Sequence, residues 1–301
     1  MTAHEDRLSA DLLAHALATL EVARTSTASP TEARSGAGVY HVRTSTGRPA
    51  YLKVTPATLG RAVMAGAERE LRFYRQVAPS LPVATPALLG TVSAPDGLAL
   101  LLADAGTERA PTAWTDGDWA LLGRALARIH ATPVPDGEWT RPDTLLTAVE
   151  TPDLDRIRAF WAPVLPRLES LLEQRTETID QLTSQPTAFV HGDCHAANIV
   201  HGERGPVFCD WQSTGLGRAS ADLAFLSVRA TPTGAEVSPA LVETYLAHRR
   251  QPVDPDCLKR AVLLEELAVY VFEWPAFAAY NDATGVARVR RRAADLADRL
   301  G

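Results

Sequence analysis

Residues 190–198 are Val-His-Gly-Asp-Cys-His-Ala-Ala-Asn, and Phe-Cys-Asp-Trp follows at residues 208–211. Three polar side chains in this region have a telling order: Asp193, then Asn198, then Asp210. An aspartate that accepts a proton, followed by an asparagine and a second aspartate that hold Mg²⁺, is the order found in phosphoryl-transfer sites. We therefore predict Asp193 as the catalytic base, and Asn198 and Asp210 as the ligands of a Mg²⁺ ion that neutralises nucleotide phosphates.

The segment between Asn198 and Asp210 predicts a β-hairpin. Residues 199–201 and 207–209 are β-prone, and the Gly-Glu-Arg-Gly sequence at 202–205 is typical of a turn. A hairpin of this length folds back and brings its two ends together. Two hard oxygen ligands would then converge on one ion, which suits Mg²⁺ with its remaining positions filled by phosphate and water.

A zinc site is the alternative for this region, because His191, Cys194 and His195 are ligand types crowded around Asp193. Structural zinc needs four ligands with recognisable spacing, and the remaining cysteines form no CxxC pair. The phosphoryl-transfer interpretation is therefore favoured over zinc.

Composition restricts the class of protein. A chain of 301 residues fits one large domain or two lobes, and a formal net charge of −6 argues against nucleic-acid binding. Three cysteines in so long a chain give no disulfide framework and indicate a reducing compartment. Residues 1–6 show no signal-peptide pattern, and no apolar run approaches the roughly 20 residues that span a bilayer. We expect a soluble, cytoplasmic protein.

Lys53 is one of only two lysines in a chain that otherwise uses arginine, and it lies in the strand-like run at 50–54. A lysine retained under such a bias indicates a need for a compact ammonium group. The glycines Gly36 and Gly38 precede this run in a predicted hairpin, a shape that can cover nucleotide phosphates with backbone N–H groups. An ordinary hairpin turn is the alternative.

A helix is predicted over 61–78, and it contains Glu68 and Glu70. A site of this kind needs a helix glutamate to pair with the strand lysine and hold it on the α- and β-phosphates. We choose Glu70 as the partner of Lys53, with Glu68 as the alternative.

The predicted strands end after residue 102, and the chain then becomes mostly helical. We predict an α+β fold with two lobes, 1–104 for nucleotide binding and 105–301 for catalysis and substrate binding. The backbone of Ala103 and Ala105 would form the hinge that contacts the adenine. Further helices are predicted over four ranges: 119–130, 155–182, 239–250 and 256–274.

The chain resembles the aminoglycoside phosphotransferase family, antibiotic kinases that form a small-molecule branch of the protein-kinase-like fold. The resemblance runs from roughly Gly36 to Leu267. It rests on these segments: Tyr51-Leu52-Lys53, the Glu68–Glu70 helix with Leu81-Pro82-Val83, His191-Gly192-Asp193 with Asn198, Asp210-Trp211, and Asp222-Leu223-Ala224. It implies a small antiparallel β-sheet lobe with one key helix and a larger helical lobe. It also implies ATP or GTP as donor, Mg²⁺ as cofactor and a small-molecule hydroxyl as acceptor.

The resemblance assigns further roles by position. Lys53 would contact the α- and β-phosphates, and Asp222 would brace the catalytic loop. The family often holds cationic antibiotics with acidic residues of C-terminal helices, so Glu265 and Glu266 become candidate substrate contacts, with a plain acidic helix surface as the alternative. Gly192 stands where protein kinases have the arginine of H-R-D, and no Ala-Pro-Glu follows. A protein substrate is therefore not expected.

The acceptor is left open by these motifs. A cationic antibiotic is favoured, with resistance as the consequence. A metabolic kinase for a sugar, amino sugar, choline-like compound or amino alcohol is the runner-up, and a nucleotide-binding pseudokinase is a third possibility. We expect a monomer or homodimer that binds neither nucleic acid nor membranes.

Overall fold

The computed structural model describes residues 3–25, 31–32, 36–134, 136–250 and 252–301. The chain forms two compact units. The first comprises Met1–Thr107 together with His201–Glu203 and Val207–Ser213, and the second comprises the remaining segments. The segment that contains Asp210 thus belongs to the same unit as Lys53, although the two residues are far apart in the chain. The predicted lobe boundary at residue 104 stays a prediction.

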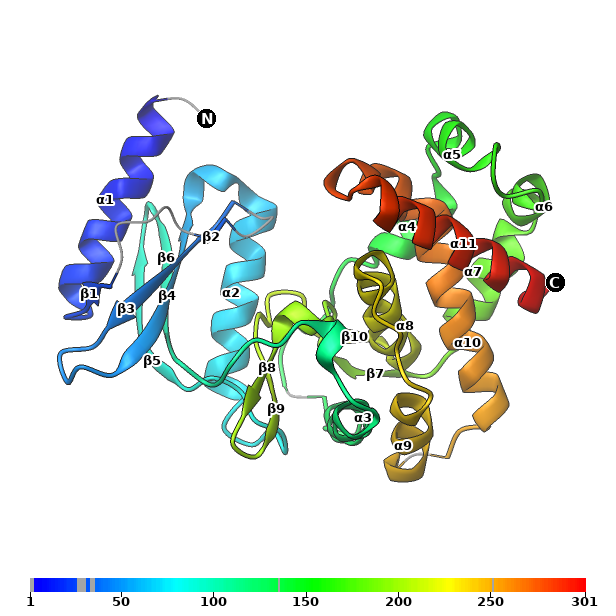
Figure 1. Cartoon of the computed structure of the whole chain (residues 1–301). Coiled ribbons are helices and arrows are strands. Elements are labelled where there is room, and N and C mark those ends of the chain that lie inside the picture. The colour runs from blue at the N-terminus through cyan, green and yellow to red at the C-terminus, as the bar shows by residue number, and fades with distance from the viewer. Residues whose placement is uncertain (1–2, 26–30, 33–35, 135, 251) are drawn as a thin grey trace. The chain divides into compact units, whose positions relative to one another are not determined.

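The first unit is built on an antiparallel sheet with strand order β1-β3-β4-β6-β5, to which β2 adds by pairing with β3. Helices α1 and α2 lie on opposite faces of this sheet (Figure 1). The bounds are α1 Ala3–Thr19, β1 Ala23–Arg24, β2 Thr31–Glu32, β3 Gly38–Arg43, β4 Pro49–Pro56, α2 Arg61–Gln76, β5 Leu88–Ala94 and β6 Gly97–Ala103.

Alternation along β4 decides which side chains face which helix. Leu52 and Val54 are buried in a hydrophobic cluster with Leu12 and Ala16 of α1. Because successive side chains of a strand point to opposite faces, Lys53 points to the other face of the sheet, where α2 lies. The alternation along β4 therefore places the buried ammonium group of Lys53 on the face of the sheet that packs against α2.

The second unit is mainly helical. Its helices are α3 Asp116–His130, α4 Thr144–Glu150, α5 Leu154–Trp161, α6 Leu168–Glu173, α7 Arg175–Thr183, α8 Ala219–Ala230, α9 Ala240–His248, α10 Pro255–Ala268 and α11 Ala283–Leu300. β7 (Thr187–Val190) pairs with β10 (Gly215–Arg218) in an antiparallel ribbon. The hairpin predicted between Asn198 and Asp210 is present as β8 (Ile199–Gly202) and β9 (Gly205–Phe208), and its residues are divided between the two units.

Two predicted helices differ from the structure. The helix expected over 155–182 is divided into α5, α6 and α7. Pro163 and Pro166 lie between α5 and α6, and proline both lacks the backbone N–H and clashes with the preceding turn. The helix expected over 256–274 ends at Ala268 and continues as a π-helical turn, Val269–Glu273.

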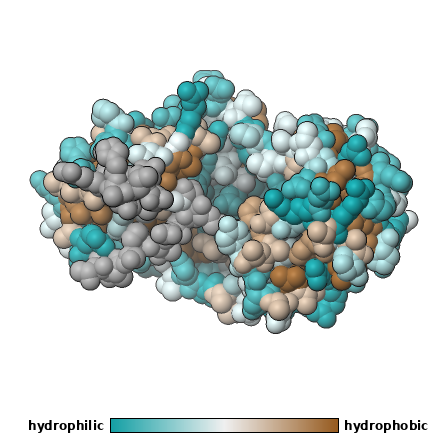
Figure 2. Space-filling view, turned by 90° about the horizontal axis from the view of Figure 1, so that it is seen from above, coloured by the Kyte–Doolittle hydropathy of each residue, from teal (hydrophilic) through white to brown (hydrophobic). Residues whose placement is uncertain are grey.

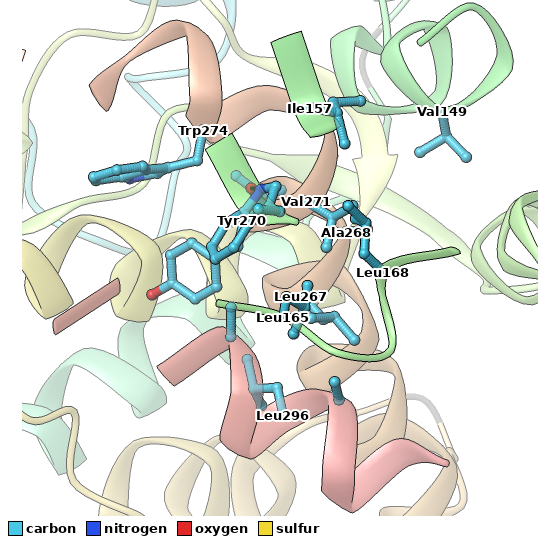
Figure 3. Packing of buried hydrophobic residues seen from close by; sticks show 14 of the residues in the cluster. Val149, Ile157, Leu165, Leu168, Leu267, Ala268, Tyr270, Val271, Trp274 and Leu296 are labelled. Atoms are coloured by element: carbon cyan, nitrogen blue, oxygen red, sulfur yellow. Dashed lines mark hydrogen bonds between the residues drawn. The ribbon is translucent and has the colours of Figure 1, made fainter. Parts of the chain in front are cut away.

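A large hydrophobic core holds the second unit together. Leu267 at the end of α10, Tyr270 in the π-helical turn and Trp274 just after that turn lie in one cluster with Leu296 of α11 and Ile157 of α5 (Figure 3). These side chains come from segments more than a hundred residues apart in sequence, so the core ties the C-terminal helices to the middle of the chain.

The surface of the second unit is mixed. Figure 2 shows hydrophilic residues over much of its visible face, with hydrophobic residues scattered among them. Isolated exposed hydrophobic side chains of this kind are ordinary on a globular protein. In the part of the chain that the structure describes, no helix has both the length and the apolar character needed to cross a membrane.

Candidate active site

Lys53 is the centre of an ion-pair cluster in the first unit. Its Nζ lies 2.6 Å from Oε2 of Glu70 and 2.8 Å from Oδ1 of Asp210. Lys53 is 7% exposed and Glu70 is 0% exposed, so both charges are removed from solvent. Of the two glutamates considered in the sequence, Glu70 contacts Lys53 and Glu68 faces solvent.

The pKa values of this cluster reflect burial and pairing. Burial alone would lower the pKa of Lys53, but the charges of Glu70 and Asp210 outweigh it and raise the value above normal. Burial raises the pKa of Glu70, and the charge of Lys53 opposes this only in part. The ammonium group therefore stays charged at neutral pH.

The residues after Asp210 are fastened to α2. The Trp211 backbone N–H donates to Oε1 of Glu70 (3.2 Å), and the Trp211 ring stacks on Phe73 with centroids 3.9 Å apart. Arg69 donates from Nη1 to the backbone oxygen of Gln212 at 3.1 Å. These contacts support Asp210 in a left-handed conformation with φ 60°, which is unusual for a residue other than glycine.

Phe73 and Arg69 were not identified from the sequence. Both flank Glu70 on α2, and Phe73 follows it by three residues, on the same helix face. Helical spacing around Glu70 indicates which side chains lie near it on α2. It does not indicate which distant residues those side chains contact.

Gly36 and Gly38 lie where the chain leads from β2 into β3. Gly36 has φ +81°, which glycine adopts without the strain that other residues would meet. Gly38 begins β3, and its neighbour Val39 lies directly opposite Lys53 in the antiparallel pairing with β4. The two glycines therefore lie just before the residue of β3 that pairs with Lys53. Ser35, which begins the predicted hairpin, is outside the described residues.

The two predicted hinge residues differ in their backbone hydrogen bonds. The N–H of Ala103 donates to the oxygen of Ala87 at 2.9 Å, because Ala103 still belongs to the sheet. Among the described residues, the backbone of Ala105 makes no such bond. Ala105 is therefore the better candidate for contact with a nucleotide base.

Asp193 and Asn198 are brought together in the second unit. The Asn198 side-chain N–H groups donate to the backbone oxygen of Asp193 (2.9 Å) and to its Oδ2 (3.1 Å). His195 Nε2 lies 3.6 Å from Asp193 Oδ1. Burial would raise the pKa of Asp193, but hydrogen bonding and positive charge from His195 hold it well below its usual range. The carboxylate is therefore ionised at neutral pH.

These hydrogen bonds orient the Asn198 amide. Because both donors of the amide are directed at Asp193, its oxygen points away from that residue and is left for another partner. An amide oxygen and a carboxylate are both hard ligands of the type that Mg²⁺ prefers, so the side-chain chemistry of Asn198 in the second unit and of Asp210 in the first fits the predicted ion. Among the described residues, no cluster of three or more His, Cys, Asp or Glu side chains is placed to hold a metal.

Asp222 braces the loop that carries Asp193. Its carboxylate, 1% exposed, accepts from the backbone N–H of His191 (2.8 Å) and of Gly192 (2.9 Å). Gly192 has φ +83°, a conformation in which a side chain would be strained. The loop therefore depends on Asp222 as an internal acceptor.

Glu265 and Glu266 are poorly placed to bind substrate. Each is 1% exposed. Glu265 accepts from Arg218 at 2.5 Å, and Glu266 pairs with Arg292 at 2.7 Å. Both carboxylates already have cationic partners in the interior, so their contacts support a structural role instead of the predicted contact with an acceptor.

Comparison with known proteins identifies the type of sequence. Residues 29–261 match the model of a family described as "Phosphotransferase enzyme family". A search of curated proteins found no match.

Solved structures show the same fold at low sequence identity. The amicoumacin kinase hAmiN, in complex with AMP-PNP, Ca²⁺ and Ami, is 14% identical with a TM-score of 0.63, and the match covers 99% of this chain and 96% of that one. An aminoglycoside phosphotransferase from Streptomyces rimosus, in complex with ADP and streptomycin, is 20% identical with a TM-score of 0.54. The match covers 86% of this chain and 98% of that one. A putative fructosamine-3-kinase from Haemophilus somnus is 11% identical with a TM-score of 0.57, and the match covers 97% of this chain and 99% of that one. The predicted kinase-like fold is confirmed.

Proposed function

The chain belongs to the phosphotransferase enzyme family, and from this premise we propose that it moves the γ-phosphate of ATP or GTP to a hydroxyl of a small molecule. The observation that carries this proposal is the pairing of Lys53 with both Glu70 and Asp210, residues 17 and 157 positions away. A lysine held by a helix glutamate beside a metal-binding aspartate is the phosphate-binding arrangement of kinases.

The candidate residues described above have distinct parts in holding the nucleotide and its metal ion. Lys53 binds the α- and β-phosphates, while Glu70 and the Trp211 contact keep Lys53 and Asp210 in place. Backbone N–H groups at Gly36 and Gly38 cover the phosphates, and the Ala105 backbone hydrogen-bonds the base. The Asp210 carboxylate and the Asn198 amide oxygen would be the residues that hold Mg²⁺, and the ion would neutralise negative charge on the transferred phosphoryl group.

Asp193 orients the acceptor and takes its proton. As the bond between the γ-phosphorus and the leaving oxygen breaks, the acceptor oxygen bonds to phosphorus and its proton passes to the Asp193 carboxylate. The lowered pKa of Asp193 makes its carboxylate a weak base. Its main contribution is therefore to position the acceptor hydroxyl, which becomes acidic enough to lose its proton only late in the transfer. Asn198 holds the carboxylate in one rotamer for this purpose.

We propose a cationic antibiotic as the acceptor, with resistance as the result. Glu265 and Glu266 are already paired with arginines, so we assign the acidic contact with the acceptor to Glu273. This residue lies in the π-helical turn, and its side chain is only partly buried. Burial raises the pKa of Glu273, a hydrogen bond with Thr144 opposes this in part, and the charges of Asp143 and Glu265 add to the increase. An ammonium group would relieve that unfavourable environment, so a cationic ligand gains more there than a neutral one.

An acceptor panel tests the proposal. Nucleotide consumption would be measured with Mg²⁺ and ATP or GTP against aminoglycosides, cationic peptide antibiotics, macrolides and amino sugars. The proposal predicts acceptor-dependent turnover with a cationic antibiotic that is lost in Asp193→Asn. Turnover only with neutral sugars would replace the antibiotic by a metabolic acceptor, and nucleotide binding without turnover on any acceptor would indicate a pseudokinase.

A further inference from the structure

A series of buried and partly buried hydrogen bonds leads from the end of α9 to the loop that carries Asp193. His130, the last residue of α3, is 5% exposed. Its Nδ1 lies 3.0 Å from the hydroxyl of Tyr245, and its Nε2 lies 3.1 Å from Oδ2 of Asp222. Arg249, at the end of α9, donates from Nη1 to the same Tyr245 hydroxyl at 2.9 Å.

The groups at the two ends of this hydrogen-bond series fix the same donor-to-acceptor direction along it. A guanidinium group can only donate, so the Tyr245 oxygen accepts from Arg249 and its own proton is left to point at His130 Nδ1. At the other end, Asp222 already accepts from two backbone N–H groups, and as a carboxylate it can only accept from Nε2.

The protonation of the two terminal groups agrees with this direction. Burial raises the pKa of Tyr245 to about 12, so its hydroxyl keeps the proton that it donates. Burial would raise the pKa of Asp222 as well, but the hydrogen bonds that it accepts from His130 and from the backbone N–H of Gly192 lower the pKa below normal, so it remains a carboxylate.

We propose that Arg249 and Tyr245 are positioning residues that hold His130 as the neutral tautomer protonated on Nε2. Asp222 then receives a third donor and keeps its full negative charge for the N–H groups of His191 and Gly192. An imidazolium would instead leave the Tyr245 proton without an acceptor in the interior, where Tyr245 is 0% exposed. The partly exposed end of α9 thereby sets the stiffness of the catalytic loop.

Nuclear magnetic resonance of the ¹⁵N-labelled full chain tests the tautomer directly. In the wild type, Nδ1 of His130 should resonate as an unprotonated nitrogen and Nε2 as a protonated one. In Tyr245→Phe and Arg249→Leu, this single tautomer should be lost, and the amides of His191 and Gly192 should exchange with solvent about tenfold faster. Arg249→Lys keeps a donor and should restore both signals, while Arg250→Leu, at the exposed neighbouring arginine, should change neither.

The activity arm rests on the proposed function: kcat should fall in Tyr245→Phe and Arg249→Leu with the KM for nucleotide unchanged. The tautomer and exchange signals need no acceptor, so they decide the inference even if the proposed reaction is wrong. A wild-type His130 protonated on Nδ1 would overturn it, as would unchanged exchange at His191 and Gly192 in both variants. Arg249→Leu keeps the inference testable if Tyr245→Phe fails to fold.

Discussion

Lys53 Nζ lies 2.6 Å from Oε2 of Glu70, and both side chains are almost wholly excluded from solvent. A buried ion pair of this kind contributes little to stability compared with a well-packed apolar pair, because removing both charges from water is costly. Its presence therefore indicates a functional requirement, and the second contact of Lys53 with Asp210 indicates which one: a fixed positive charge beside the predicted metal ligand.

Replacing this lysine should affect turnover and stability together. In Lys53→Met, we expect turnover to fall by about 10²–10³-fold, since one preorganised charge on the phosphates is lost. The free energy of unfolding should fall by about 3–5 kcal/mol, because Glu70 is left buried without a partner. Steady-state kinetics and chemical denaturation measure the two effects.

The second lysine of the chain provides a matched control. Lys259 is solvent-exposed and lies 3.8 Å from Asp256 on its own helix. Lys259→Met should keep wild-type kinetics and change stability by less than about 1 kcal/mol. Equal kinetics in Lys53→Met and Lys259→Met would remove Lys53 from the site.

Glu265 and Glu273 should separate structure from acceptor binding. Glu265→Gln weakens a buried pair with Arg218, so it should lower the midpoint of thermal unfolding and leave the KM for acceptor near the wild-type value. Glu273→Gln should instead raise that KM for a cationic acceptor with little loss of stability. A raised acceptor KM in a stable Glu265→Gln variant would reverse this assignment.

Asp222 should make the stability of the chain depend on pH in the acid range. Its pKa is lower in the folded protein than in the unfolded chain, where it is about 3.9. The carboxylate therefore contributes its full stabilisation above the unfolded value and loses it as the pH falls through the lower folded value.

Denaturation of wild type and Asp222→Asn at several pH values measures this contribution. The difference in unfolding free energy should stay constant from neutral pH down to about pH 5 and shrink below about pH 4. A difference that grows on acidification would mean that Asp222 is protonated in the folded state.

Local patterns were sufficient to predict several parts of the fold and the candidate site. The strand with Lys53, the helix with Glu70 and the hairpin before Asp210 each depend on a few neighbouring residues, so periodicity and turn chemistry identify them. The family and the kinase-like fold followed from the motifs, and the comparisons confirm both.

The remaining features depend on contacts that no local pattern contains. In the sequence, Glu265 and Glu266 look like an acidic helix surface. In the structure, Glu265 pairs with an arginine 47 residues before it, and Glu266 pairs with an arginine 26 residues after it. The hydrogen bond of His130 with Asp222 spans 92 residues. In contrast, Pro163 and Pro166 are plain in the sequence, so the break of the helix predicted over 155–182 could have been foreseen.

The most direct test of the central claim is the acceptor-dependent turnover of Asp193→Asn at saturating nucleotide. Asparagine keeps the size of the side chain but cannot take the proton. We predict that turnover falls by about 10²–10⁴-fold while the Kd for nucleotide stays at the wild-type value. Turnover close to wild type in this variant would contradict the assignment of Asp193, and with it the proposed route of phosphoryl transfer.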